Sequence, residues 1–157
     1  MTLVSQFVVG PAMADCNDSP MPKVDWVRCY MDGRDFPDAD LKEAELRDAS
    51  FFRANLKRAD FSGADAYRAK FYLAILSGAR FDNARVAEAD FSEADLRSAS
   101  FRKADLRGAK LVSADLREAD LTGANLRSTD LFRANLSGAT WTDGKRRCAE
   151  GSIGQCN

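Results

Sequence analysis

The stretch ADFSEADLRSASFRKADLRGAKLVSADLREADL, residues 89–121, repeats one five-residue pattern without an insertion. Each unit holds alanine, then a polar residue that is most often aspartate, then leucine or phenylalanine, then two variable residues. The same phase runs from Trp26 to Trp141, which makes 24 consecutive pentads. Phe or Leu fills the large position in 19 of them, so this series predicts a core.

A period of five fits neither a straight helix nor a straight strand. On an α-helix the large residues would wind around every face, because five residues advance about 140° beyond one turn. On a strand they would alternate between faces. A chain that bends once per pentad turns both the alanine and the large residue inward, since residues two apart on an extended segment share one side.

Four equal sides close one coil every 20 residues. The period alone does not exclude three sides, but the identical spacing of small and large residues on every side favours four. The sequence therefore predicts an all-β solenoid, a right-handed quadrilateral β-helix of about six coils. Its handedness follows the rule for parallel crossovers, and its length is about 29 Å at the spacing of adjacent strands.

The corners of such a coil have their own residue preferences. Asp or Asn precedes the large residue in 14 of the 24 pentads, and its short side chain can bond the neighbouring backbone at a turn. We assign nearly all of these residues that structural role. Glycine recurs two positions after the large residue, where a corner tolerates unusual φ. These glycines are Gly33, Gly63, Gly78, Gly108, Gly123 and Gly138.

The two ends of the repeat need covers, because they would expose unpaired strand edges and core. Residues 15–25 are the predicted N-terminal cap, 26–141 the β-helix and 142–157 the C-terminal cap. Residues 1–14 are interpreted as a signal peptide or its remnant, since Ala12-Met13-Ala14 is a small-residue cleavage signal. The segment contains no Lys or Arg, so a disordered tail is the alternative.

Four cysteines lie in two pairs near the two ends. The pairs are too far apart on a rod of about 29 Å to share a zinc ion. We predict the disulfides Cys16–Cys29 and Cys148–Cys156, which indicate an oxidising compartment. The expected location is therefore outside the cytoplasm, in the periplasm or an equivalent oxidising lumen.

The composition argues against several function classes. The chain has 23 basic and 24 acidic residues, a formal net charge of -1 and no histidine. A nucleic-acid ligand or an acidic mimic of nucleic acid would need a strong field of one sign. The absence of histidine removes the commonest general base and metal ligand. No apolar run is long enough to span a bilayer, so membrane insertion is not expected.

Paired carboxylates are a candidate catalytic feature. A 20-residue offset stacks Asp95 over Asp115 and Asp40 over Asp60, roughly 5 Å apart, a separation that suits a retaining glycosidase. Any acidic repeat produces such ladders, however, and a flat wall offers no cleft to exclude water. We expect no catalytic residue, no cofactor and no metal ion.

Arginines that follow the large residue form another candidate feature. They fall on three different sides, each with acidic neighbours, whereas a nucleic-acid site needs a clustered and uncompensated stripe. We interpret them as an ordinary solvated surface and expect no nucleic-acid partner. These arginines are Arg97, Arg102, Arg107, Arg117 and Arg127.

Apolar residues at outward positions indicate an interaction surface. One exterior column holds Phe52, Tyr72, Val112 and Phe132 at multiples of 20 residues, and an exposed apolar column often marks an interface. Mutual support of stacked side chains across adjacent strands is the alternative. It explains Phe52 with Tyr72 better than it explains the nearby apolar residues. The full candidate surface is Phe52, Tyr67, Tyr72, Leu73, Ile75, Val112 and Phe132.

The coil around residues 66–76 also departs from the repeat inside. Ala66 occupies a position that is larger in every other pentad, and Val86 on the same side is also small. We therefore expect this wall to be under-filled, with an inward shift or a small void.

The pattern A-(D/N)-L-x-x resembles the consensus of the pentapeptide-repeat family. It is matched fully by residues 94–98, 114–118 and 134–138, and the resemblance covers about three quarters of the chain. The resemblance implies the quadrilateral β-helix and little about function, because this fold is a scaffold. We expect a non-enzymatic exported structural or protein-interaction scaffold that binds an unidentified protein or itself.

The resemblance also suggests an alternative function. Some members of the family resemble duplex DNA in shape and charge and protect or inhibit DNA gyrase. Those proteins are cytoplasmic, strongly acidic and dimeric through a C-terminal helix. This chain departs from them in its net charge of -1 and in its Gly-rich C-terminal segment with two cysteines.

Overall fold

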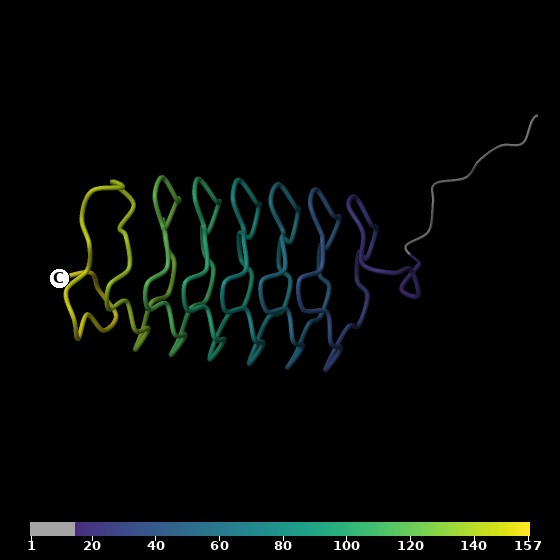
Figure 1. The fold of residues 1–157 in the computed structure, drawn as a ribbon, viewed down its shortest axis with the longest axis horizontal. Helices are drawn as coiled ribbons and strands as arrows, with labels where there is room; N and C mark the ends of the chain where they lie inside the picture. Colours follow the sequence, from purple (N-terminus) through teal and green to yellow (C-terminus); the bar gives the residue numbers. More distant parts are fainter. Residues whose placement is uncertain (1–14) are drawn as a thin grey trace, which may run out of the picture.

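The chain winds into a stack of similar coils that together form a rod (Figure 1). The computed structural model describes residues 15–157, so the predicted signal peptide lies outside the described residues. Within residues 15–157 there is no helix and no strand longer than an isolated bridge. Parallel bridges run from Asp25↔Glu45 to Asp120↔Thr140, and each joins residues 20 apart. One coil therefore contains four pentads, as the repeat predicts.

Four walls result from this register, and each is defined by one column of large inward residues. Wall 1 contains Met31, Phe51, Phe71, Phe91, Leu111 and Leu131. Wall 2 contains Phe36, Leu56, Leu76, Leu96, Leu116 and Leu136. Wall 3 contains Leu41, Phe61, Phe81, Phe101, Leu121 and Trp141. Wall 4 contains Trp26, Leu46, Ala66, Val86, Leu106 and Leu126.

Backbone hydrogen bonds join each coil to the next. On wall 1 the N–H of Phe71 donates to the carbonyl of Asp90 at 2.7 Å, and the N–H of Asp90 donates back to the carbonyl of Ala69 at 2.9 Å. The same pair of bonds recurs on every wall through the middle of the rod. This ladder satisfies the backbone without long strands, which is why the walls contain only single bridges.

A tight turn forms every corner. After Phe71, for example, the N–H of Ala74 donates to the carbonyl of Phe71 at 3.0 Å. The residue two after the large one has positive φ at all 24 corners from Lys23 to Gly138, as a type II turn requires. The six corner glycines predicted from the sequence are confirmed, and 18 residues of other types, including Leu73 at +58°, adopt the same conformation.

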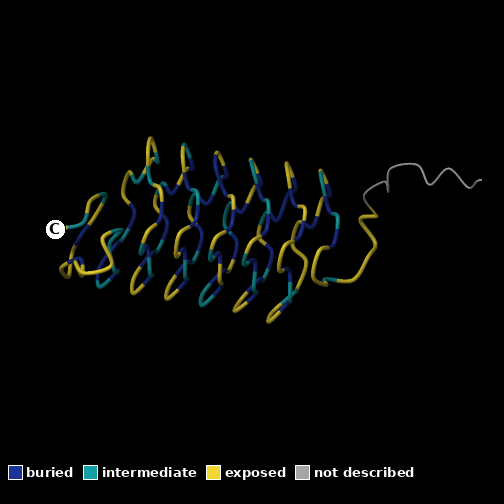
Figure 2. Ribbon diagram, turned by 90° about the horizontal axis from the view of Figure 1, so that it is seen from above, coloured by how far each residue is buried: buried dark blue, intermediate teal, exposed yellow. Residues whose placement is uncertain are grey.

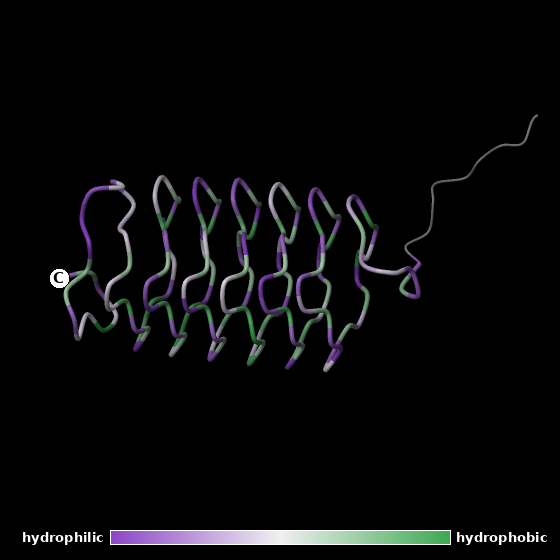
Figure 3. Cartoon of the chain, in the orientation of Figure 1, coloured by the Kyte–Doolittle hydropathy of each residue, from purple (hydrophilic) through white to green (hydrophobic). Residues whose placement is uncertain are grey.

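Alanine and the large residues fill the interior, while polar residues cover the outside (Figures 2 and 3). Phenylalanines from the opposite walls 1 and 3 meet at the centre. Phe51, Phe71 and Phe91 stack along wall 1 with centroids 5.1 and 4.8 Å apart, and Phe71 meets Phe61 edge to face at 5.7 Å. Ala66 is fully buried on wall 4 beside these rings. The void predicted there stays a prediction.

The two ends of the rod differ. At the C-terminal end, residues 142–157 fold back with the antiparallel bridges Asn135↔Ile153 and Thr140↔Arg147, and Cys148 is bonded to Cys156. At the N-terminal end, Cys16 is bonded to Cys29, which is buried on wall 1. The turn geometry already begins at Met21, because the N–H of Val24 donates to its carbonyl.

Candidate interaction surface

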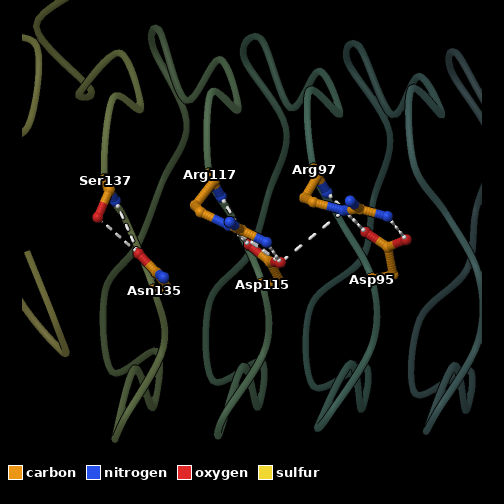
Figure 4. Close-up of polar contacts among 6 residues, drawn as sticks. All are labelled: Asp95, Arg97, Asp115, Arg117, Asn135 and Ser137. Atoms are coloured by element: carbon orange, nitrogen blue, oxygen red, sulfur yellow. Dashed lines mark hydrogen bonds and ion pairs between the residues drawn. The ribbon is translucent and has the colours of Figure 1, made fainter. Parts of the chain in front are cut away.

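Aspartate and asparagine side chains hold the corners of the coil, as their recurrence predicts. On wall 2, the Oδ1 atoms of Asp95 and Asp115 accept bonds from the backbone N–H groups two residues later, at 3.3 and 3.2 Å (Figure 4). Asn135 does the same for the N–H of Ser137 at 3.1 Å. These bonds satisfy a donor that the turn leaves exposed, so most of these residues have a structural role.

The stacked carboxylates of wall 2 are neutralised within the chain. The guanidinium of Arg97 donates to both oxygens of Asp95 at 2.8 and 2.7 Å, and Arg117 binds Asp115 in the same way (Figure 4). Hydrogen bonds from these guanidinium groups lower the pKa of both aspartates. This agrees with the acidic neighbours that the sequence places beside these arginines, and neither Asp95 nor Asp115 has the raised pKa that a general acid needs.

The same pairing recurs on walls 3 and 4. Arg107 binds Asp105 at 2.7 Å and lowers its pKa, and Arg102 lies 3.0 Å from Asp120. Burial opposes ionisation of Asp120, but hydrogen bonds from Thr122 and Arg102 outweigh it and lower its pKa. Carboxylates therefore compensate four of the five predicted arginines, and Arg127 forms no ion pair within residues 15–157. A single uncompensated arginine is not the basic stripe that a nucleic-acid site needs.

At two corners serine replaces the usual aspartate, and an aspartate of the preceding coil accepts the hydrogen bonds instead. Asp32 accepts bonds from the Ser50 hydroxyl at 2.5 Å and from the Phe52 N–H at 3.0 Å. Asp82 likewise accepts bonds from the Ser100 hydroxyl and from the Arg102 N–H. Sequence reasoning missed this substitution, whose signal is an aspartate 18 residues before a serine.

The corner after wall 1 carries most of the predicted apolar surface, and we call it the aromatic corner: Phe52, Tyr72, Leu73, Val112 and Phe132. Phe52 and Tyr72 stack with centroids 5.7 Å apart, and the guanidinium of Arg53 lies 5.0 Å from the Phe52 ring. The Tyr72 hydroxyl bonds Glu93 Oε1 at 3.1 Å, and this contact raises the pKa of Tyr72.

The other predicted residues are not continuous with the stack of Phe52 and Tyr72. Ile75 is on wall 2, 44% exposed, in the position that Asp or Asn occupies in every other coil of that wall. Ser92 separates Val112 and Phe132 from Tyr72 along the corner, and Phe132 is 61% exposed beside Arg133. The column is therefore interrupted, with one apolar group near residue 72 and another near residue 132.

Tyr67 does not belong to the aromatic corner. It lies at the corner before wall 1, where the guanidinium of Arg85 is 4.5 Å from its ring. A hydrogen bond to Glu88 raises the pKa of Tyr67. Wall 1 thus separates Tyr67 from Tyr72, and the two tyrosines border one flat surface from opposite edges.

The described part of the chain, residues 15–157, has neither a metal-ligand cluster nor a membrane-spanning helix. No group of three or more His, Cys, Asp or Glu residues in residues 15–157 is placed to hold a metal ion. No helix among these residues has the length and apolarity to cross a bilayer. Charged side chains line one surface hollow at the corner after wall 2 and another along wall 1, including Arg117 with Glu150 and Lys70 with Asp90.

The repeat identifies the family. The sequence profile of pentapeptide repeats matches residues 35–72, 74–111 and 109–140 in eight copies. The chain belongs to the pentapeptide-repeat family. Membership implies the right-handed quadrilateral β-helix that the sequence predicts.

Solved structures of other pentapeptide-repeat proteins are similar to this one. HetL, which is involved in heterocyst differentiation regulation in the cyanobacterium Nostoc sp. strain PCC 7120, shares 32% identity with a TM-score of 0.54. The match covers 78% of this chain and 64% of HetL. QnrB1, a plasmid-mediated fluoroquinolone resistance protein, shares 21% identity with a TM-score of 0.72, over 76% of this chain and 64% of QnrB1.

The likeness to QnrB1 shows the fold alone. This pentapeptide-repeat protein spans less than two thirds of the length of either HetL or QnrB1. No curated protein matches its sequence.

Proposed function

We propose that this pentapeptide-repeat protein is a non-enzymatic scaffold of an exported, oxidising compartment and binds another protein at its aromatic corner. The observation that carries this proposal is the apolar group around residue 72. Phe52 and Tyr72 stack on the exterior, Leu73 follows at a half-buried turn position, and Ile75 is 44% exposed. Apolar side chains gathered on the outside of a soluble rod favour an interface.

Cross-strand support alone explains only part of this group. The stack of Phe52 on Tyr72 is the kind of pair that stabilises adjacent strands. Leu73 is the one apolar side chain among the 24 turn positions from Lys23 to Gly138, where the other residues are charged, polar or glycine. Ile75 replaces the Asp or Asn that bonds the next turn at other corners. Ile75 thereby gives up a local hydrogen bond, and both residues place an apolar side chain where the repeat is polar, which is consistent with selection for contact with a partner.

The two disulfides support the proposed compartment. Disulfides persist in oxidising environments and are rare where thiols are kept reduced. Both join segments next to the ends of the rod. The periplasm, or an equivalent oxidising lumen, is the location that fits this usage.

A binding role fits the family better than a catalytic one. Pentapeptide-repeat proteins are generally structural or interaction proteins. Catalysis needs a nucleophile and base in contact, within a site that excludes water. The aspartates of walls 2 to 4 are instead engaged by arginines and backbone N–H groups.

Gyrase protection or inhibition by mimicry of DNA is the alternative. It requires a strongly acidic rod, since duplex DNA carries one negative charge per about 1.7 Å of axis. The charge of this chain is nearly balanced at -1. A supercoiling assay with purified gyrase tests this alternative directly, and the proposed function predicts no change in gyrase activity and no protection from a quinolone.

Affinity capture from the exported fraction of the source cell tests the proposed function. The wild-type protein should retain a protein that the Tyr72→Ser, Leu73→Ser variant loses. The melting temperatures should match, because surface changes usually alter stability by less than about 0.5 kcal/mol. The matched control is Arg102→Ser, Lys103→Ser, at the equivalent turn positions of the corner after wall 3.

Three results would contradict the proposal. Unfolding of the Tyr72→Ser, Leu73→Ser variant would make these side chains structural. Equal loss of the partner in the control variant would show that the contact is not local to the aromatic corner. If the wild-type protein captures nothing and remains monomeric, the side chains of the aromatic corner only support each other across adjacent strands.

A further inference from the structure

Wall 1 differs from the other walls in what its outward side chains contact. On walls 2 to 4, ten of the twelve charged residues that precede the large position make ion pairs within residues 15–157, and Asp25 and Asp35 make none. The ten are Asp40, Glu45, Asp60, Asp65, Arg80, Arg85, Asp95, Asp105, Asp115 and Asp120. On wall 1 the corresponding charges are Lys70, Asp90, Lys110 and Asp130. Within residues 15–157, none of these four has an ion-pair partner within 4.0 Å.

The charges of wall 1 form bands of alternating sign along the rod. Parallel bridges join Ser50, Lys70, Asp90, Lys110 and Asp130 in one column, and the preceding turn contributes a second column. We call the two columns together the banded face. Its bands, in order, are Arg28 with Tyr30, Asp48 with Ser50, Arg68 with Lys70, Glu88 with Asp90, Gly108 with Lys110, and Ser128 with Asp130.

The order of the bands is positive, negative, positive, negative, positive, negative. The two central bands are the strongest, since each carries two charges of one sign. Pairing within the chain explains little of this order, because Arg68 with Asp48 at 3.5 Å is the single ion pair that the banded face forms in residues 15–157. Lys70 and Asp90 occupy adjacent bridge positions without forming one.

Reading the bands backwards exchanges every sign. A second copy that lies side by side with its rod antiparallel therefore meets a band of opposite sign at every band. The opposite charges face each other directly in the two central bands and lie in different columns in the outer four. A two-fold axis between the central bands puts Lys70 opposite Asp90 of the partner subunit, and Arg68 opposite Glu88 of the partner subunit. A parallel arrangement in register would instead oppose like charges. An antiparallel arrangement is also closed, because the same surface serves both copies.

The same axis brings margins of mixed polarity together. Along the aromatic corner, Phe52 comes opposite Val112 of the partner subunit, Tyr72 comes opposite the partner's Ser92, and Phe132 comes opposite the partner's Asp32. At the other edge Tyr67 comes opposite the partner's Ala87. Arg47 comes opposite the partner's Arg107, but both are already ion-paired, with Glu45 and Asp105 of their own chains.

We propose that the banded face is a self-association surface through which two copies of this chain pair side by side with antiparallel rods. This deepens the proposed interaction role, because it names a second copy as one partner and adds wall 1 to the surface. The wall alone measures about 29 Å by about 10 Å, from coil spacing and three extended residues. Its area per copy is about 300 Å², below the roughly 800 Å² of a stable interface.

Association should therefore be weak and controlled by ionic strength. Exposed ion pairs contribute little individually and are screened within about 10 Å at 0.1 M salt. We expect a monomer–dimer equilibrium with a dissociation constant on the order of 100 µM in low salt, weakening at least tenfold near 0.5 M sodium chloride.

Sedimentation equilibrium of the purified protein tests the proposal. Lys70→Asp and Asp90→Lys should each abolish dimerisation, because each opposes two pairs of like charges across the axis. An equimolar mixture of the two variants should restore a heterodimer, since every central pair is then opposite in sign. Lysine already occupies the same column at 70 and 110, so Asp90→Lys is compatible with the coil.

Lys57→Asp is the matched control. Lys57 lies at the corner after wall 2, forms no ion pair within residues 15–157, and the change alters net charge as Lys70→Asp does. This variant should dimerise like the wild type. Circular dichroism should show the same β-structure in all variants.

Several outcomes would overturn the proposal. One is a wild-type protein that is monomeric at about 0.5 mM in low salt, about five times the expected dissociation constant. Others are single variants that dimerise normally, a mixture that stays monomeric, or a control that loses dimerisation equally. If the purified protein is monomeric while the capture experiment still yields a partner through Tyr72 and Leu73, self-association fails and the proposed function stands.

Discussion

Walls 1 and 2 share one backbone and differ on both of their surfaces. Inside, wall 1 stacks phenylalanine through the middle of the rod while wall 2 stacks leucine. Outside, wall 2 pairs Asp95 and Asp115 with arginines of its own chain, while Lys70 and Asp90 of wall 1 form no ion pair in the described residues. The coil register is the same on both, because the backbone ladder and the corner turns set it.

The difference shows which residues are constrained and which are free. Inward alanines and a large apolar residue are required on every wall, and the exact large residue adjusts to its neighbours across the core. Outward residues are less constrained, because many supply the bond that holds the next turn while Ile75 and Lys110 supply none. The exterior of each wall can therefore vary independently, so that wall 2 pairs its charges within the chain while Lys70 and Asp90 of wall 1 form no ion pair in the described residues.

The interior difference predicts the largest effect on stability. Phe71→Ala removes a ring that stacks on two neighbours and meets two others edge to face, so it should cost about 3–5 kcal/mol. Leu76→Ala on wall 2 should cost about 2–5 kcal/mol. Phe71→Leu should cost less than about 1.5 kcal/mol, since wall 1 itself changes to leucine at Leu111. Urea denaturation measures all three, and a cost of Phe71→Ala below that of Phe71→Leu would refute the stacked core.

Each wall also depends on a different disulfide. Cys29 belongs to the first coil of wall 1, whereas the Cys148 carbonyl accepts the Gly138 N–H at the corner after wall 2. Loss of either disulfide should cost about 2–3 kcal/mol, since both close short loops. Because coils contact only their neighbours, Cys16→Ser should increase amide exchange in residues 21–40, and Cys156→Ser in residues 131–157.

Mass spectrometry after alkylation provides the chemical control for the disulfides. The oxidised protein should have no free thiol, with Cys16 linked to Cys29 and Cys148 linked to Cys156. A link between Cys29 and Cys148 would show that the pairing is wrong. Protection of the coils between residues 46 and 126 should remain unchanged in both variants.

Overpacking of the small inward column should be destabilising on every wall. Ala79 and Ala99, on wall 3, have the same inward positions as Ala69 and Ala74 on walls 1 and 2, and all four are buried. Ala79→Leu or Ala99→Leu should cost about 1–3 kcal/mol, because the added atoms force the coil apart. Unchanged melting temperatures in both variants would contradict the requirement for a small residue.

The hydrogen bonds at the corners predict a smaller effect on stability, which should be a loss on wall 2 and a gain on wall 1. Asp115→Ala removes both the acceptor for the Arg117 N–H and the partner of the Arg117 guanidinium, and should cost about 1 kcal/mol. Asp115→Asn should cost less, since Asn135 serves the same turn on the same wall. On wall 1, Lys110→Asn should gain about 0.5 kcal/mol by adding the missing acceptor for the Val112 N–H. Thermal melts in 0.5 M salt, where we expect a monomer, measure each change.

Acidification should have the smallest effect on stability, and it should act on the walls whose aspartates are paired with arginines. The pKa values of Asp95, Asp105 and Asp115 are lowered by the guanidinium groups beside them. A lowered folded-state pKa adds stability above the unfolded value of about 3.9, and this stability is lost as pH falls through the folded-state pKa. The melting temperature should be level above about pH 5 and fall below about pH 4. Asn at all three positions should flatten that fall, and an equally steep fall in this variant would refute the assignment.

Much of this fold follows from the sequence by simple arithmetic. The five-residue spacing of large residues, with alanine two positions before, determines an inward face and one corner per pentad, because extended backbone alternates sides. The corner roles of Asp95 and Gly78 follow from the chemistry of short acceptors and of positive φ. These features depend on residues within a few positions of one another, so local pattern is enough to predict them.

Other features depended on which residues 20 apart in the chain become neighbours. The pentad period alone is compatible with three walls or four, so it does not place Tyr67 and Tyr72 on opposite edges of wall 1. The replacement of a corner aspartate by Ser50 with Asp32 requires contact between coils. Positive φ at Arg68 and Leu73 contradicts their intrinsic preference and is imposed by the ladder on either side.

The sequence by itself determined the solenoid, its inward residues and the predicted pairing of the four cysteines. Only the tertiary structure decided which charges are paired. Arg97 forms an ion pair with Asp95 on wall 2, whereas Lys70 on wall 1 forms no ion pair in the described residues. An ion pair depends on side-chain direction and on distances of a few ångströms between coils, and the coulombic attraction falls with that distance. Composition, with 23 basic and 24 acidic residues, reports only the sum.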